Sequence, residues 1–230
     1  MRGVSVVIPW RGGCPHREAT RGWVLDRWRS AGHEPVVGEA PPGPWCKALA
    51  VADALPRAVD DVLVIADADV WCDGIGEAVD AVRAGAPWAI PHRDVRRLSH
   101  EATDAVLAGG ELGGRLAQRP YAGFEGGGLV VLSREVYERA PLDARFAGWG
   151  QEDQAWALAL RTLAGQPWRG DAPLWHLWHP PQARETRRWG SPASRALYDR
   201  YRAARTSAVA MTVLLGEMEV AAHGGVGDPG

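Results

Sequence analysis

The chain has 230 residues, of which 46% are hydrophobic and 23% charged, and its formal net charge is −2. This composition is typical of a globular protein with a substantial core, and the small net charge gives no general reason to expect a polyanionic partner. No apolar run approaches the ~20 residues that span a bilayer. The three cysteines are odd in number and far apart, which argues against a disulfide framework and a thiolate zinc site, so we expect a cytoplasmic protein.

Short runs rich in valine and isoleucine alternate with longer amphipathic segments in the first part of the chain. Such alternation is typical of βαβ units, which build a parallel sheet covered by helices on both faces. The alternating segments are residues 4–8, 17–30, 36–37, 45–55, 62–66 and 75–84. We therefore expect an α/β fold with a mostly parallel central sheet and flanking helices.

The rest of the chain continues with segments of both kinds. We expect a short strand at 88–90, a polar helix at 95–107, a glycine-rich loop at 109–114, a strand at 129–132, a helix at 151–163, a strand at 173–178 and helices at 191–205 and 208–220. These elements predict a single domain over residues 1–222, in which 184–222 form a helical C-terminal extension, and a disordered tail at 223–230.

Arginine is concentrated between residues 184 and 205. Seven arginines stand there against one glutamate and one aspartate, a local excess of 7 − 2 = +5. This basic run could contact phosphates. We favour a solvated helix face, because most charge runs have that simpler origin.

Two groups of residues follow strands at the carboxyl edge of the expected sheet, where open parallel sheets bind their ligands. Pro9, Trp10 and Arg11 end the first strand and offer an indole to stack on a base and a guanidinium to bind phosphate. Asp67 and Asp69 end a strand that lacks polar alternation. Two carboxylates one residue apart can hold Mg²⁺ or Mn²⁺ together with a diphosphate, although acidic residues after strands also cap helices or face solvent.

Two histidines far downstream could complete a metal site. His176 and His179 lie within four residues, and an imidazole beside a carboxylate suits Mn²⁺ better than Mg²⁺. In a regular strand their three-residue separation would point the side chains to opposite faces. If both bind the metal, the chain must therefore bend between them.

Several common catalytic motifs are absent from the sequence. There is no Walker loop, no G-x-S-x-G elbow and no G-x-G-x-x-G after the first strand, which excludes the P-loop, common hydrolase and dinucleotide-binding classes. His100 and Glu101 resemble the start of a zinc-protease helix motif, but Asp104 stands where the second histidine belongs.

Two segments resemble a known family. Residues 126–134, Gly-Gly-Gly-Leu-Val-Val-Leu-Ser-Arg, and residues 146–153, Phe-Ala-Gly-Trp-Gly-Gln-Glu-Asp, are similar to the glycine-rich strand and the G-W-G-x-E-D segment of GT-A glycosyltransferases. Galactosyltransferases and polypeptide N-acetylgalactosaminyltransferases are the members most similar in these motifs. Asp67-Ala68-Asp69 resembles the family's D-x-D motif. Gln151 and Gln154 depart from the pattern, which has glycine and a third acidic residue there.

The resemblance implies roles for individual residues. Asp69 would ligate the metal together with His179, and His176 is the less strongly supported third ligand. Asp153 would be the catalytic base and Glu152 would bind a sugar, although the helix dipole alone also favours carboxylates in a first turn. The residues implied to line the nucleotide and sugar pockets are Pro9, Trp10, Arg11, Lys47, Asp67, Gly127, Gly128 and Trp149.

The sequence therefore predicts a metal-dependent glycosyltransferase that moves a hexose or N-acetylhexosamine from a nucleoside-diphosphate sugar, most simply a UDP-sugar, to a hydroxyl group. The acceptor could be a saccharide, a protein or, through the basic run, a hydroxylated base in DNA. Two other classes stay open. A nucleotidyltransferase should carry a lysine in a glycine-rich loop after the first strand, and a carbohydrate-binding module would use the 12 tryptophans to stack on sugars.

Overall fold

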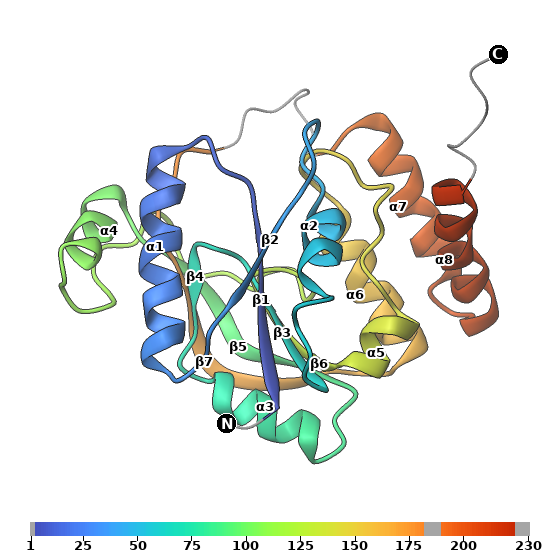
Figure 1. Ribbon diagram of the computed structural model, residues 1–230, viewed down its shortest axis with the longest axis horizontal. Helices are drawn as coiled ribbons and strands as arrows, with labels where there is room; N and C mark the ends of the chain where they lie inside the picture. Colours follow the sequence, from blue (N-terminus) through green and yellow to red (C-terminus); the bar gives the residue numbers. More distant parts are fainter. Residues whose placement is uncertain (1–2, 182–189, 224–230) are drawn as a thin grey trace.

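The structure, a computed structural model, describes residues 3–181 and 190–223. Its centre is a seven-stranded sheet with the strand order β2-β1-β3-β6-β5-β7-β4 and helices on both faces (Figure 1). The strands are β1 (Val4–Trp10), β2 (Val36–Glu39), β3 (Val62–Ala66), β4 (Val70–Trp71), β5 (Trp88–Arg97), β6 (Leu129–Ser133) and β7 (Trp168–His176). The helices are α1 (Pro15–Ser30), α2 (Lys47–Ala54), α3 (Ile75–Arg83), α4 (His100–Leu107), α5 (Arg134–Arg139), α6 (Glu152–Leu163), α7 (Pro192–Ala204) and α8 (Ala208–His223).

The α/β class with a central sheet and flanking helices is confirmed, but the sheet is mixed rather than mostly parallel. Strand β1 pairs in parallel with β2 and β3, and β5 does so with β7. Strand β6 is antiparallel to both of its neighbours, β3 and β5, and β4 is antiparallel to β7. The reason is the path of the chain after β5. It enters β6 opposite the carboxyl end of β3, where Leu129 faces Ala66, so β6 must run back across the sheet.

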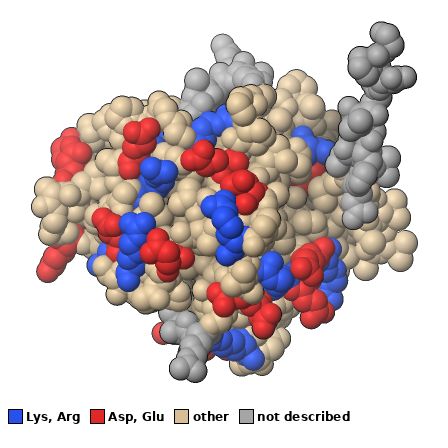
Figure 2. Space-filling view, in the orientation of Figure 1, with Lys and Arg blue, Asp and Glu red and all other residues tan. Residues whose placement is uncertain are grey.

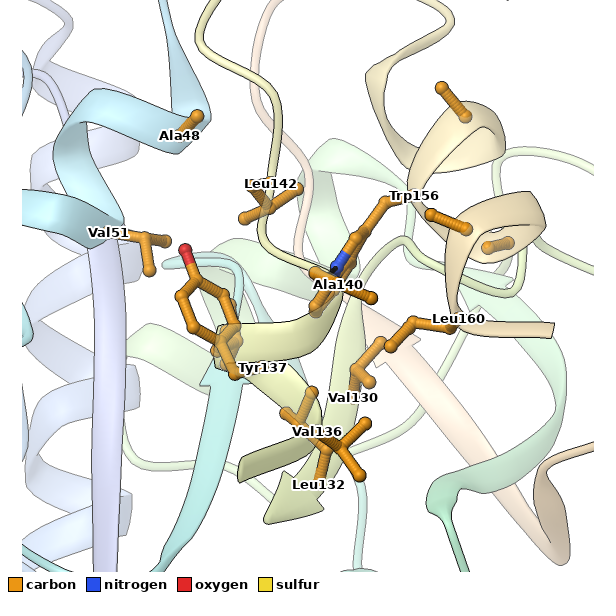
Figure 3. Packing of buried hydrophobic residues seen from close by; sticks show 14 of the residues in the cluster. Ala48, Val51, Val130, Leu132, Val136, Tyr137, Ala140, Leu142, Trp156 and Leu160 are labelled. Carbon is orange, nitrogen blue, oxygen red and sulfur yellow. Dashed lines mark hydrogen bonds between the residues drawn. The ribbon is translucent and has the colours of Figure 1, made fainter. Parts of the chain in front are cut away.

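Both faces of the central strands are buried. In β3, Leu63 and Ile65 belong to one hydrophobic cluster, while Val64 and Ala66 belong to a second cluster on the opposite face. The first cluster receives residues of α2, α5, α6, α7 and α8, and Figure 3 shows Trp156 of α6 within it. The second lies under α1 and α3. Burial on both sides explains why β3 lacks polar alternation.

Several elements differ from their predicted bounds. The polar segment expected as a helix at 95–107 begins as strand, because β5 pairs with β7 as far as Arg97. Helix α4 starts only at His100, where the Ser99 hydroxyl caps it by accepting a hydrogen bond from the N–H of Ala102 (3.2 Å). Strand β7 begins earlier than expected, and β4 and α5 were not predicted at all. Tertiary pairing and short length account for these differences.

The C-terminal helices α7 and α8 pack against α6 and share its hydrophobic cluster. A polar network also joins them to the loop after α5. Buried Asp143 accepts hydrogen bonds from the Tyr201 hydroxyl (2.7 Å) and from Arg145 Nη2 (2.7 Å), and Arg145 Nη1 donates to Glu217 of α8 (2.9 Å). A buried carboxylate is tolerated only when it is paired in this way.

Two described arginines of the basic run pair with neighbouring carboxylates. Three of its seven arginines, and the tail at 224–230, lie outside the described residues. Arg200 and Arg202 pair with Glu217 and Asp199 on exposed side chains. In Figure 2 basic and acidic residues are interspersed over the visible face. Across residues 3–181 and 190–223, no helix has both the length and the apolar character required to cross a membrane.

Removing the Tyr201 hydroxyl tests the network around Asp143. Because the acceptor is a buried carboxylate, we expect Tyr201→Phe to lower the free energy of unfolding by about 1.5–3 kcal/mol, measured by chemical denaturation. Tyr198→Phe on the same helix is the matched control, since the Tyr198 hydroxyl makes no hydrogen bond within the described part of the chain. The control should change stability by less than about 0.5 kcal/mol. Equal stability of the two variants would contradict this account of the network.

Candidate active site

Two strand pairings place the D-x-D segment beside distant parts of the chain. Asp67 follows β3; its N–H donates to the carbonyl of Gly128 (2.8 Å), and its carboxylate accepts from the N–H of Gly128 (3.2 Å). Asp69 immediately precedes β4, whose antiparallel pairing with β7 reaches His176. The carbonyl of Asp69 accepts from the N–H of Leu177 (2.8 Å). The two-residue strand β4 therefore brings the D-x-D segment to the late histidines.

Asp69, His176 and His179 offer three ligand atoms within 4.8 Å of one another. Nε2 of His179 lies 3.2 Å from Oδ2 of Asp69, and Nε2 of His176 lies 3.8 Å from Oδ1 of the same residue. The bend that this requires is present, because β7 ends at His176 and the chain leaves the strand there. The structure thus brings together the three residues predicted to bind metal.

Backbone carbonyls orient both imidazoles. Nδ1 of His176 is 2.8 Å from the carbonyl oxygen of Leu177, and Nδ1 of His179 is 2.8 Å from that of Pro180. A carbonyl only accepts hydrogen bonds, so each Nδ1 donates, and each Nε2 is turned toward the carboxylate of Asp69. Burial lowers the pKa of His176 to about 4, which keeps this ring neutral. One carboxylate with two imidazoles is a donor set that fits Mn²⁺.

Arg17 was not predicted, yet it lies at this cluster. It belongs to the first turn of α1, and its Nη2 is 3.6 Å from Oδ2 of Asp69. Its guanidinium stands over the Trp149 ring, 4.7 Å from the ring centroid. This arrangement puts a fixed positive charge between the carboxylate and the Gly-Trp-Gly turn. The signal that could have identified Arg17 is a helix N-terminus directly after β1, which is a common anion-binding position.

Lys47 joins the D-x-D segment to the predicted base. This sole lysine of the chain is the first residue of α2 and is buried. Its Nζ lies 2.9 Å from Oδ1 of Asp67 and 3.0 Å from Oδ1 of Asp153. Burial acts to lower the pKa of Lys47, but the charges of Asp153 and Asp67 outweigh it and raise the pKa above its ordinary value. The ammonium group therefore stays charged between two carboxylates.

The triple glycine is explained by the close approach of α6. A Cβ on Gly126 would lie 2.2 Å from the carbonyl oxygen of Asp153, and one on Gly127 would lie 2.6 Å from Oδ2 of the same residue. Gly128 has a φ of +71°, and a Cβ there would lie 2.5 Å from Leu174. Only glycine lets this loop pass against the first turn of α6. The predicted contacts of Gly127 and Gly128 with nucleotide or sugar stay predictions.

Glu152 and Asp153 open α6 with different surroundings. Oε2 of Glu152 accepts a hydrogen bond from the N–H of Gly150 (2.7 Å), and burial beside the Asp153 charge raises the pKa of Glu152 to about 7. Burial also raises the pKa of Asp153; Lys47 opposes that rise and Asp67 adds to it. Buried carboxyl groups with raised pKa values beside a cation are suited to proton transfer near neutral pH.

The predicted nucleotide-binding turn is less open than expected. Pro9 is buried in β1, and Trp10 is 5% exposed, with the Arg21 guanidinium 4.4 Å from its ring centroid. Trp10 thus offers no free face for stacking on a base, because the strand alternation turns it into the second hydrophobic cluster. Arg11 donates to the carbonyls of residues 41, 43 and 44, so its guanidinium holds this loop.

Two other indoles flank the site. Trp45 and Trp149 are both partly exposed and stack with ring centroids 5.8 Å apart and planes 21° apart. Trp149 lies where the resemblance implies, next to the acidic pair. Trp45 was not among the predicted site residues. It lies two residues before Lys47, the first residue of α2, and so at the same edge of the sheet as the other site residues.

Gln151 is the residue at which the sequence departs from the G-W-G-x-E-D pattern by replacing a glycine. Its φ is +68°, the left-handed conformation, and it is the sole non-glycine residue with a positive φ in the described part of the chain. This conformation costs a non-glycine residue roughly 1–2 kcal/mol. Gln151 therefore holds a left-handed backbone conformation, which glycine adopts most easily.

A pocket of about 180 Å³ borders the metal-ligand segment. His100 and Trp178 stack in its wall with ring centroids 4.0 Å apart, and His16 meets both rings edge-on. Trp178 directly precedes His179. This pocket is thus a neighbour of the candidate metal cluster, between α1 and α4.

No protein-family model matches the sequence, and comparison with curated proteins gives no significant match. Solved structures do match. GalNAc-T7 with UDP, GalNAc and Mn²⁺ has a TM-score of 0.55 at 12% identity, covering 94% of this chain and 55% of that one. Glucosyl-3-phosphoglycerate synthase from Mycobacterium tuberculosis, in complex with phosphoglyceric acid, has a TM-score of 0.50 at 16% identity, covering 89% and 80%.

A Drosophila β-1,4-galactosyltransferase 7 mutant in complex with manganese, UDP-Gal and xylobiose has a TM-score of 0.43 at 18% identity. It covers 72% of this chain and 63% of its own, so the chain spans less than two thirds of that relative. GalNAc-T7 and the synthase have the GT-A fold of nucleotide-sugar transferases, and the fold implied by the sequence motifs is confirmed.

Gly126→Ala tests the close approach of α6. The added methyl group would collide with the backbone of Asp153, so we expect a loss of about 1–3 kcal/mol in the free energy of unfolding. Thermal and chemical denaturation measure it. Gly76→Ala is the control, because Gly76 lies in α3 with nothing within 4 Å of an added Cβ, and this helical change should be neutral or stabilising. A neutral Gly126→Ala variant would show that the loop and α6 are not held in contact.

Proposed function

We propose that the chain is a metal-dependent glycosyltransferase that moves a hexose or an N-acetylhexosamine from a UDP-sugar to the hydroxyl group of a saccharide or protein acceptor. The proposal is carried by the meeting of a three-ligand cation cluster and a lysine-bound carboxylate at one edge of a GT-A sheet. The Mn²⁺ and UDP bound to GalNAc-T7, which shares this fold, support the same class of reaction.

The donor diphosphate would bind at the cation cluster. Asp69, His176 and His179 would hold a divalent ion, which when bound acts as a Lewis acid and stabilises the charge on the leaving phosphates. Arg17 would contact the same diphosphate. Its guanidinium and the N-terminus of α1 both favour an anion there.

Asp153 would take the proton from the attacking acceptor hydroxyl. Lys47 holds Oδ1 of Asp153, which leaves Oδ2 as the oxygen that can accept this proton. Glu152 is the less suitable base, because its Oε2 is committed to the N–H of Gly150. We assign it to sugar binding, with Trp149 as a wall of the sugar pocket.

The two alternative classes fit the site less well. A nucleotidyltransferase needs a lysine in the loop after β1, whereas the sole lysine lies in α2 between two carboxylates. A carbohydrate-binding module needs free indole faces, whereas Trp28, Trp88 and Trp156 are fully buried and the partly exposed Trp45 and Trp149 stack on each other. Neither alternative explains why backbone carbonyls orient the imidazoles of His176 and His179 toward Asp69.

Metal binding depends on Asp69. We expect Asp69→Asn to weaken Mn²⁺ binding at least about 10-fold, because it removes the charged ligand of the cluster. Calorimetric titration measures this affinity, and Mn²⁺-dependent release of UDP from a panel of UDP-sugars should be lost in parallel. Asp80→Asn is the control, since this carboxylate lies on α3 and its side chain is 78% exposed. Unchanged Mn²⁺ affinity in Asp69→Asn would refute the cluster as a metal site.

Turnover depends on Asp153. Asp153→Asn should lower kcat about 10²–10⁴-fold, the usual contribution of a general base, while the affinity for donor and Mn²⁺ is retained. Glu152→Gln should change the KM for donor or acceptor more than kcat. Steady-state kinetics with an active UDP-sugar separates the two effects. Full turnover by Asp153→Asn would remove it from the mechanism.

A further inference from the structure

The chain contains one lysine among its 26 basic residues, and that lysine is buried at the candidate active site. A guanidinium is a planar fork suited to two acceptors in one plane, whereas an ammonium is a compact charge with three donors. Asp67 and Asp153 reach Nζ of Lys47 from different elements, the end of β3 and the first turn of α6. The compact ammonium group suits this bridge better than a guanidinium would.

Lys47 lies behind the two carboxylates. Its side chain is 6% exposed, against 35% for Asp67 and 25% for Asp153. A ligand that enters the site meets the carboxylates first. This order argues against the role in nucleotide binding that the family resemblance implies for Lys47.

Asp67 is also fixed on its other side, where its second oxygen accepts a hydrogen bond from the N–H of Gly128 (3.2 Å). Oδ2 of Asp153 faces Gly127, and the lack of a side chain there leaves room beside this oxygen, since a Cβ would be 2.6 Å away. Lys47 therefore closes a chain of contacts that runs from the D-x-D segment through the ammonium group to α6. Without Lys47, nothing cationic in this chain of contacts would hold Asp153.

We propose that Lys47 is a positioning residue, which fixes the orientation of Asp153 and ties it to the D-x-D segment without contacting the nucleotide. The proposal rests on the proposed function where it takes Asp153 as the base. Its structural half, the bond between Lys47 and Asp153, does not depend on the reaction.

The charges around Asp153 give the expected pH dependence. The groups that face it are Lys47 from α2, Asp67 from the end of β3 and Glu152 from its own turn. Removing the one cation leaves two carboxylates around the base, and the loss of a nearby positive charge raises the pKa of a carboxyl group. The ionised base then forms at higher pH, so the acidic limb of kcat should move to higher pH in a variant without Lys47.

A single lysine allows a direct measurement. In protein labelled with ¹³C and ¹⁵N at the lysine side chain, one ammonium signal is expected, in slow exchange with water because Nζ is enclosed. It should shift in Asp153→Asn and stay unchanged in Arg57→Met, which removes an exposed cation paired with Asp53 just after α2. A signal that exchanges rapidly with water and has the same chemical shift in wild type and Asp153→Asn would overturn the proposal. The measurement uses wild type, Asp153→Asn and Arg57→Met, and it does not require that a Lys47 variant folds.

Kinetics test the functional half. Lys47→Met should lower kcat about 10²-fold, toward the lower end of what a general base contributes, with the donor KM nearly unchanged and the acidic limb displaced upward. Arg57→Met should retain wild-type kinetics. A raised donor KM with unchanged kcat in Lys47→Met would overturn the proposal and make Lys47 a nucleotide ligand. If wild type turns over no sugar nucleotide, the proposed function fails, and the lysine signal still decides whether Lys47 holds Asp153.

Discussion

Four carboxylates converge at the carboxyl edge of the sheet, and the site depends on how their repulsion is offset. Asp67, Asp69, Glu152 and Asp153 come from two segments that are far apart in the sequence. Buried like charges are unfavourable unless cations or hydrogen bonds balance them. Lys47 lies between Asp67 and Asp153, while Asp69 is balanced separately by the guanidinium of Arg17 and lies beside two imidazoles. The negative charge is therefore offset at two separate places, by Lys47 at one and by Arg17 at the other.

This division follows from the backbone of the D-x-D segment. In a continuous strand, residues two apart point to the same face of the sheet. Strand β3 ends at Ala66, however, and a turn precedes β4, so Asp67 and Asp69 separate. Asp67 faces Lys47 and the triple glycine, and Asp69 faces β7. The short strand β4 holds them apart, and the proposed proton transfer and the proposed metal binding are thereby placed on opposite sides of one turn.

The sequence was informative where a pattern extends over many residues, and less so where a few residues pair across the chain. An uninterrupted apolar run predicted β3, and so placed the acidic segment after it at the end of a buried strand. The pairing of β4 with β7 involves two residues on β4, too few for any periodicity, so the meeting of Asp69 with His176 and His179 was proposed from ligand chemistry and family resemblance, not from a strand pattern. The role predicted for Trp10 in the nucleotide pocket stays a prediction, and the strand alternation of β1, which turns this indole into the core, was not considered. Arg17 was missed because one arginine at a helix start has no distinctive pattern.

The acidic pair at the start of α6 also shows why helix capping and catalysis need not be competing explanations. The partial positive charge at a helix N-terminus stabilises a nearby carboxylate by about 0.3–1 kcal/mol, and this acts in the same direction as Lys47 on Asp153. The dipole alone does not distinguish Glu152 from Asp153, because both lie in the first turn. Their partners do: Glu152 binds the backbone of the Gly-Trp-Gly turn, and Asp153 binds a buried ammonium group. Helix placement favours the ionised form of both residues, and the single lysine holds only Asp153, the residue proposed as the base.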